Sequence, residues 1–321
     1  MEEMRETIGE SFFGIRWDRD FFRCNNSYNT EKAGGTDMGV YQEFADVYDR
    51  FMDNIPYEKW GGYLDNLIRK YGVSKPKRDA ESPLESERNL VVDLGCGTGT
   101  LTEMMYGKGY DMIGVDASEY MLNVAMEKKE KSGSEILYLQ QDMRDLELYS
   151  TVGTVFCVCD GLNYILEESE LLDVFSRVDN YLFPGGIFIF DFNTDYKFRE
   201  VIGDATIAES REDCSFIWDN FYDVEEGINE YDLTVFVRAE GELFRRFTET
   251  HYQRGYTVEQ MIGLAEQAGM EVLEVRDADT GEEAASTSQR VCVVAREKKK
   301  NPTVPKELST NNCYGGQTEK F

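Results

Sequence analysis

Short apolar runs alternate with amphipathic stretches from Asn89 onward, and this rhythm is the main structural signal in the chain. The runs are LVVDL, MIGVD, ILYLQ, TVFCVCD and GGIFIFDFN, at residues 90–94, 112–116, 136–140, 154–160 and 185–193. Because strands that alternate with helices pair in parallel, we predict an α/β protein with a doubly wound sheet.

The rhythm changes after Asn193. Residues 213–254 hold three runs of alternating apolar and polar residues, separated by turn sequences. This alternation predicts an antiparallel meander, inserted into the α/β pattern over residues 194–256. A helix and a strand follow over 257–277, with Gly269 at the end of the helix, and RVCVVAR (290–296) predicts a last strand.

The flanking segments divide the chain further. Helical spacing before Gly72 predicts a helical cap, and a polar stretch with Pro76 and Pro83 predicts a linker. The two ends show no clean period or have the composition of a disordered tail. We therefore expect an extension, a helical cap, a linker, a main domain and a disordered tail, at residues 1–36, 37–72, 73–88, 89–296 and 297–321.

Composition adds a strong acidic bias to this picture. Hydrophobic residues make up 41% of the chain and aromatic residues 13%, which is typical of a globular protein, and the formal net charge is −28. A surface this acidic repels phosphate backbones, so we expect no nucleic-acid partner, although the charge also suits plain solubility.

Several classes of site and location are excluded or disfavoured. No apolar run approaches the roughly 20 residues that cross a membrane, and the N-terminus lacks a signal-peptide pattern. We expect a cytoplasmic protein without a membrane span, as a monomer or a homodimer. His251 is the single histidine, and the seven cysteines form no CxxC pair. Histidine-rich zinc sites are therefore excluded, and we expect reduced thiols and no metal.

The sequence NLVVDLGCGTGTLTEMM (89–105) predicts a buried strand that runs into a glycine-rich turn and then a helix. Gly95, Gly97 and Gly99 have the spacing G-x-G-x-G, whereas a dinucleotide-binding turn has glycine at the position of Thr100. A P-loop is excluded because no Gly-Lys-Ser/Thr follows. The free amides at the start of the helix suit a single carboxylate better than a diphosphate.

Three acidic residues lie at the ends of the first three predicted strands. Asp93 lies in the first strand, Asp116 ends the second and Asp142 follows the third, so we expect all three at one carboxyl edge of the sheet. Asp116 is placed to accept both hydroxyl groups of an unmodified ribose. Such a crevice suits a cofactor with net positive charge and no phosphate, and S-adenosylmethionine has these properties.

Four motifs, in this order, resemble those of class I S-adenosylmethionine-dependent methyltransferases. They are VVDLGCGTG, IGVDASEYML, QDMRDL and LFPGGIFIFDF, at residues 91–99, 113–122, 141–146 and 182–192. The resemblance extends from about Tyr41 to Arg296. It implies a Rossmann-like sheet of seven strands in the order 3-2-1-4-5-7-6 with strand 7 antiparallel, and RVCVVAR is placed to be strand 7.

Within that family, three features of the sequence resemble those of enzymes that methylate small molecules, such as aminosugar N,N-dimethyltransferases and glycine or sarcosine N-methyltransferases. The similar features are YQEFADVYDRFM (41–52), DMRD after the third strand, and the antiparallel insertion. CDGLNYI (159–165) resembles the DSLNYL signature of a bacterial branch, with Gly161 where that branch has serine. The resemblance implies methyl transfer to nitrogen or oxygen of a small-molecule acceptor, with S-adenosylhomocysteine as the product.

By resemblance, the glycines shape the turn, Asp116 holds the ribose, and Asp142 and the Met143 amide meet the adenine. Asp116 or Asp142 could instead be a helix N-cap, and Met121 and Met143 could simply fill space in the core. The full set expected to bind the cofactor is Tyr41, Tyr48, Asp93, Gly95, Cys96, Gly97, Gly99, Asp116, Ala117, Met121, Asp142 and Met143.

His251 is the expected general base, because histidine titrates near neutral pH. The alternative is a structural histidine at the end of a strand. Asp160 is the second expected catalytic residue, and Asn163, Tyr164 and Tyr222 are expected to contact the acceptor. The aromatic residues of the insertion either line a pocket or form a core between the sheet and the insertion.

Three other functions are compatible with part of the pattern. One is methylation of a protein or tRNA, which the acidic charge disfavours for RNA. Another is a non-catalytic S-adenosylmethionine-binding protein. The third is a nicotinamide dehydrogenase, which Thr100 and the acidic crevice disfavour.

Overall fold

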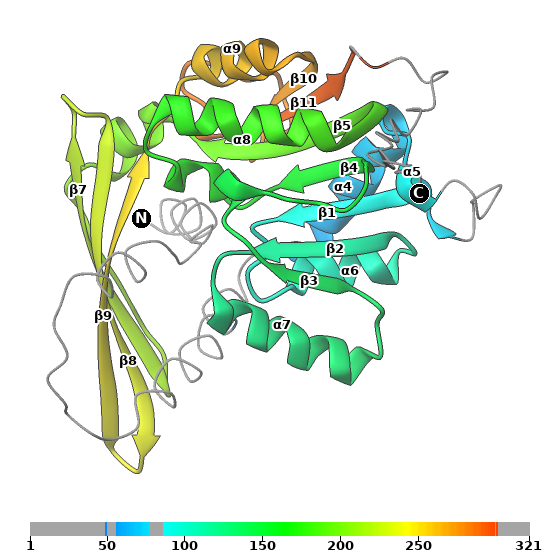
Figure 1. Ribbon diagram of the computed structural model, residues 1–321. Coiled ribbons are helices and arrows are strands. Elements are labelled where there is room, and N and C mark those ends of the chain that lie inside the picture. Colours follow the sequence, from blue (N-terminus) through cyan, green and yellow to red (C-terminus); the bar gives the residue numbers. More distant parts are fainter. Residues whose placement is uncertain (1–48, 50–55, 78–85, 299, 301–321) are drawn as a thin grey trace, which may run out of the picture.

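The computed structural model describes residues 49, 56–77, 86–298 and 300 (Figure 1). Its helices and strands follow one another as α4 (Tyr57–Tyr71), α5 (Ser86–Asn89), β1 (Leu90–Leu94), α6 (Thr100–Gly107), β2 (Asp111–Asp116), α7 (Glu119–Ser132), β3 (Leu137–Gln140), η4 (Met143–Asp145), β4 (Val152–Cys157), η5 (Gly161–Tyr164), α8 (Glu168–Tyr181), β5 (Leu182–Asn193), η6 (Lys197–Ile202), β6 (Thr206–Ser210), β7 (Cys214–Asp223), β8 (Ile228–Glu240), β9 (Leu243–Arg254), α9 (Val258–Ala268), β10 (Met270–Asp277) and β11 (Arg290–Glu297). Apart from Asp49, the helix predicted over 41–52 lies outside the described residues.

The main sheet has seven strands in the order β10-β11-β5-β4-β1-β2-β3. The pairs β1–β2, β2–β3, β1–β4 and β4–β5 are parallel, whereas β11 runs antiparallel to both β5 and β10. Counted in the family's way, this is the order 3-2-1-4-5-7-6, so the predicted fold class and the antiparallel last strand are confirmed.

Helices cover both faces of this sheet, which explains why its strands are continuous apolar runs. Val91 and Ile187 face a core built with α4 and α6, while Val92 and Phe188 face the core under α8 and α9. Successive side chains in a strand point to opposite faces, so each strand contributes to both cores. Figure 1 shows α8 and α9 on one side of the sheet and α4, α6 and α7 on the other.

The insertion after β5 forms a second sheet of four antiparallel strands in the order β6-β7-β8-β9. Three strands were predicted, and the short β6 is the addition. Phe216 and Trp218 are buried on the inner face of β7, while Ile217 and Phe221 are exposed on its outer face. In Figure 1 this sheet stands to one side of the seven-stranded sheet, with the β8–β9 hairpin extending away from it.

The described part of the predicted linker is packed against the main sheet. Ser74 is buried, and its hydroxyl lies 2.9 Å from the hydroxyl of Thr154 in β4. It also donates a hydrogen bond of 3.1 Å to the Arg88 carbonyl. The first residues of this stretch therefore help to close the amino edge of β4.

Across the described ranges, no helix is long and apolar enough to cross a membrane. In the same ranges no group of three or more His, Cys, Asp or Glu side chains is arranged to hold a metal ion.

Two glycine-to-alanine substitutions should change stability in opposite directions. A Cβ at Gly153 in β4 would lie 1.8 Å from the Arg88 carbonyl oxygen, whereas a Cβ at Gly263 in α9 would meet no atom of the described residues within 4 Å. We expect G153A to lower the free energy of unfolding by about 1–3 kcal/mol through overpacking. G263A should raise it by up to about 1 kcal/mol because alanine favours helix. Urea unfolding of both variants measures this, and equal effects would contradict the close approach at Gly153.

Candidate functional site

The glycine loop between β1 and α6 is tied to the end of β2. Gly95, Gly97 and Gly99 have φ angles of 76°, 55° and 73°, in the left-handed region that glycine adopts without strain. The amides of Gly95 and Cys96 donate to the Val115 carbonyl at 2.6 and 2.9 Å. The Gly97 amide donates to Oδ2 of Asp116 at 2.7 Å. The loop and the β2 carboxylate thus form one unit.

Two of these glycines serve different steric needs. A Cβ at Gly99 would lie 2.5 Å from the Tyr138 hydroxyl oxygen and 2.9 Å from the Ala125 Cβ, so this glycine lets β3 and α7 pack against the loop. Among the residues that the structure describes, none has an atom within 4 Å of a Cβ built at Gly97. These residues therefore leave space at Gly97, beside Asp116, as a loop that lets a ligand approach its backbone requires.

The predicted acids occupy the carboxyl ends of neighbouring strands. Asp93 is buried in β1 and accepts a hydrogen bond of 2.7 Å from the Thr102 hydroxyl. Asp116 is also buried, and its Oδ1 accepts from the Ser118 amide at 2.9 Å. The Gln141 amide donates to the Asp116 carbonyl at 2.9 Å, which brings the segment of Asp142 to the same edge.

Asp142 is held mainly by its own chain segment. Its carboxylate accepts from the Arg144 amide at 2.9 Å and forms an ion pair of 2.6 Å with the Arg144 guanidinium. Burial raises the pKa of Asp142 above its usual range, while the hydrogen bond from the Arg144 amide opposes this shift. Asp142 is thus an N-cap of η4, the alternative that the sequence left open, and it remains partly exposed at the crevice.

The remaining predicted cofactor residues lie around the same loop and strand ends. Cys96 is buried within the loop, and the Ala117 carbonyl accepts from the Gln140 side chain at 3.3 Å. Met121 is buried against aromatic residues of the insertion, and Met143 packs on the core under α8. Tyr41 and Tyr48 lie outside the described residues.

A lysine that the sequence analysis missed holds the glycine loop from α7. Lys128 Nζ donates to the hydroxyls of Thr98 and Thr100 at 3.0 and 2.7 Å. It also forms an ion pair of 2.7 Å with Asp49, whose other carboxylate oxygen accepts from Thr98 at 2.7 Å. The motif itself contains no lysine, and no pattern linked this distant residue to it.

His251 lies on the inner face of the insertion, in a group of aromatic rings. It is buried in β9, and its ring stacks on Tyr231 of β8 with centroids 4.9 Å apart. Tyr231 in turn stacks on Trp218 at 4.2 Å, and the edge of Tyr164 meets His251 at 6.1 Å. Nε2 of His251 lies 3.3 Å from a carboxylate oxygen of Glu249.

Asp160 sits in a buried ionic network at the end of β4. Its Oδ1 lies 2.9 Å from Arg290, and its Oδ2 accepts from the Gln253 side chain at 2.8 Å. Its backbone amide donates to Asp191 at 2.9 Å, and Asp191 forms a second ion pair with Arg290 at 3.0 Å. Burial raises the pKa of Asp160 above its usual range, and the positive charge of Arg290 opposes that shift.

The three residues expected to contact the acceptor are not gathered at one point. Asn163 donates to the carbonyls of Asn193 and Arg254, both at 2.8 Å. The hydroxyls of Tyr164 and Tyr231 lie 2.9 Å apart, beside His251. Tyr222 instead donates to Asp195 and stacks on Phe198 at the base of the insertion.

Four buried polar residues of this edge were missed by the sequence analysis: Asp191, Lys197, Gln253 and Arg290. Lys197 donates to the Asn193 side chain at 2.9 Å. Burial and the nearby positive charge of Arg290 lower the pKa of Lys197. The only available signal was a charged residue inside or beside an apolar run, such as Asp191 in FIFDFN and Arg290 before VCVVA.

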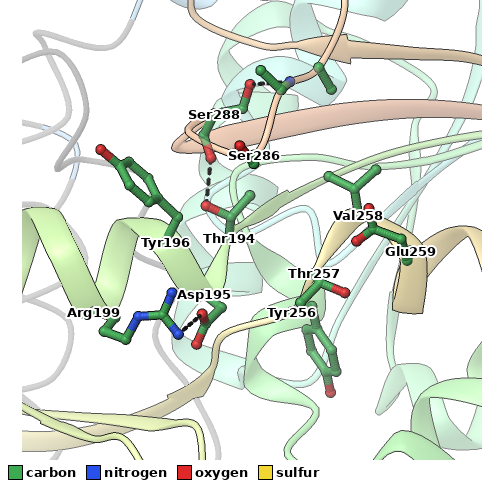
Figure 2. A pocket seen from close by; sticks show the side chains of 12 residues that line it. Thr194, Asp195, Tyr196, Arg199, Tyr256, Thr257, Val258, Glu259, Ser286 and Ser288 are labelled. Carbon is green, nitrogen blue, oxygen red and sulfur yellow. Dashed lines mark hydrogen bonds and ion pairs between the residues drawn. The ribbon is translucent and has the colours of Figure 1, made fainter.

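A cavity of about 250 Å³ lies where β5, η6 and α9 meet, apart from the glycine loop (Figure 2). Thr194, Arg199, Glu259 and Ser288 are among its lining residues, which include none of the predicted site residues that the structure describes. Arg199 is held there by an ion pair of 2.8 Å with Asp195.

Comparison with known proteins agrees with this geometry. A family model described as a methyltransferase domain matches residues 91–186. A protein of Geobacillus sp. (strain WCH70) that is named a methyltransferase is 35% identical over 257 residues, which cover 80% of this chain and 99% of that protein.

Solved structures share the architecture. An S-adenosylmethionine-dependent methyltransferase from Clostridium acetobutylicum ATCC 824 has a TM-score of 0.69 and 26% identity, covering 81% of this chain and all of that one. The sugar N-methyltransferase KedS8 from Streptoalloteichus sp. has the same fold, with a TM-score of 0.62 at 17% identity over 85% of this chain and 98% of that one. The motifs, the sheet order and the full-length relative agree, and the chain belongs to the class I S-adenosylmethionine-dependent methyltransferases.

Proposed function

We propose that this methyltransferase transfers a methyl group to nitrogen or oxygen of a small-molecule acceptor. The acceptor would bind between the carboxyl edge of the seven-stranded sheet and the inner face of the insertion. The observation that carries this proposal is the position of His251. It is buried on that inner face, with Glu249 at 3.3 Å and Tyr164 of the main domain beside it.

The residues around the glycine loop suit S-adenosylmethionine. The space that the described residues leave beside Gly97 would admit a ligand close to the backbone, where the start of α6 would favour a carboxylate. The Asp116 carboxylate is oriented by two backbone amides and can still accept ribose hydroxyls. Asp93, Gly95, Cys96 and Gly99 would form the methionine side of the site, and Ala117, Met121, Asp142 and Met143 the adenine side. Lys128 would keep the loop in shape through Thr98 and Thr100.

S-adenosylmethionine supplies an electrophilic methyl group, so the protein contributes mainly alignment and exclusion of water. A base is needed only where the acceptor is protonated or loses a proton as it attacks. We assign that role to His251. Glu249 lies within ion-pairing distance of Nε2, so it can stabilise the imidazolium that forms when His251 takes up a proton.

The inner face of the insertion and the charge of the protein both favour a small acceptor. Its inner face is a layer of buried rings backed by a single sheet, and the net charge of −28 disfavours an RNA substrate. The sugar N-methyltransferase KedS8 uses the same fold. Incubating the protein with labelled S-adenosylmethionine and metabolite fractions, purified proteins or tRNA tests the substrate class. Label transferred only to protein or tRNA would contradict the proposal.

Replacing Asp116 should weaken cofactor binding. We expect D116A to raise the dissociation constant of S-adenosylmethionine by roughly 5- to 150-fold, the equivalent of about 1–3 kcal/mol for a lost partner of buried polar groups. Isothermal titration calorimetry measures this. Asp111 lies at the opposite end of the same strand, so D111A is the matched control and should leave the affinity unchanged. Equal affinities for the wild type and D116A would remove the ribose role.

Replacing His251 should remove the pH dependence of the chemical step. With the acceptor identified by the label screen, we expect H251Q to lower kcat by about 10²–10⁴-fold, the usual contribution of a general base. Its rate should also lose the rise with pH that deprotonation of a histidine produces. S-adenosylmethionine affinity should stay unchanged. An H251Q enzyme with the wild-type pH–rate profile would show that His251 is structural.

A further inference from the structure

The segment that follows β4 contacts the insertion through each of its polar side chains. We call residues 160–164 the docking segment. Asp160 accepts from Gln253 of β9 at 2.8 Å, and Asn163 donates to the Arg254 carbonyl at 2.8 Å. The Tyr164 hydroxyl lies 2.9 Å from that of Tyr231 in β8. All three contacts reach β9, the strand that carries His251, or its neighbour β8.

The main domain holds this segment in a strained conformation. Cys159 and Asp160 have φ angles of 65° and 56°, a region that residues with a Cβ rarely adopt. The Asp160 amide donates to Asp191, and the Asp160 carboxylate is paired with Arg290. Strained backbone persists only where its surroundings over-determine it, and it clusters at functional sites. The main domain therefore fixes Asp160 independently of the insertion.

The hydrogen bond between Gln253 and Asp160 lies close to His251 in the chain. Gln253 lies two residues from His251 in β9, so both side chains point to the inner face of the sheet. The stretch of β9 that carries His251 is therefore bonded to a rigid point of the main domain. Tyr164 fixes the neighbouring strand, because Tyr231 pairs directly with His251 in the register of β8 and β9.

We propose that Asp160 and Tyr164 are positioning residues that dock β8 and β9 onto the main domain and so place His251 at the methyl-transfer site. Asp160 then acts through Gln253 and does not touch the reacting atoms. The part that concerns His251 rests on the proposed function. The docking itself is independent of that function and can be measured without the acceptor.

Hydrogen exchange with mass spectrometry tests the docking in the full-length protein. The variants are Q253M, which removes the hydrogen bond from the insertion to Asp160 at similar side-chain size, and Y164F, which removes only the hydroxyl. Each should raise the exchange rate of amides in β8 and β9 by roughly 5- to 100-fold, the loss expected for an unpaired buried polar group. Exchange in β1 and β2 should stay at the wild-type rate.

T206V is the matched control. It removes a 2.6 Å hydrogen bond between Thr206 and Asp219, which lies within the insertion and does not reach the main domain. We expect this variant to leave exchange in β8 and β9 unchanged. The single histidine gives a second readout, because its imidazole NMR signals report the surroundings of His251 alone. Those signals should shift in Q253M and stay in place in T206V.

The outcomes separate the two proposals. Unchanged exchange in β8 and β9, or an equal rise in β1 and β2, would overturn the docking role. Calorimetry with S-adenosylmethionine should give affinities within about twofold of the wild type for Q253M and Y164F, since neither residue is at the cofactor site. Faster exchange in β8 and β9 of Q253M and Y164F would support the docking role whatever His251 does. If H251Q also had the wild-type pH–rate profile, His251 would be rejected as the base and the docking role would stand.

Discussion

The structure at the carboxyl edge of the seven-stranded sheet depends on one buried cation. This is the guanidinium of Arg290, which lies between the carboxylates of Asp160 and Asp191. A buried carboxylate is costly unless it is paired, and removing one member of such a group leaves the others uncompensated. Arg290 begins β11, Asp191 lies in β5, and Asp160 follows β4. The antiparallel last strand of the fold thus supplies the charge that holds the turn after β4. Through Gln253, the same turn holds the insertion.

The arrangement of the glycine loop and of the acids at the strand ends was largely predictable from the sequence, because these parts lie close together in the chain and follow strand ends. The glycine spacing and the acids at 93, 116 and 142 need only the periodicity of β and α elements to be placed at one edge. The sheet order was implied by the family resemblance that the motifs carry, and the structure has it. Lys128 was missed because it reaches the loop from the middle of α7, and only the packing of α7 on the loop brings them together.

The contacts of the residues that we expected near the acceptor were less predictable, for a physical reason. Asp160, Asn163 and Tyr164 were named as candidate site residues, but several of their partners (Arg290, Gln253, Arg254 and Tyr231) lie about 70 to 130 residues later in the chain. Contacts at such separations depend on how distant strands pair and how the two sheets pack, and strand alternation carries no information on either. Of the aromatic residues of the insertion that we expected in a pocket or core, Phe216, Trp218 and Tyr222 are buried, whereas Phe221 is exposed because it lies at an outward position of the alternating strand β7.

The acidic residues at the cofactor edge have a consequence for turnover. The methyl donor carries a sulfonium, whereas the product left after transfer is a neutral thioether. In the proposed binding mode, the carboxylates at this edge would attract the sulfonium of the donor more strongly than the neutral thioether of the product. Methyl transfer would remove that positive charge from the ligand and so weaken its electrostatic attraction to the site.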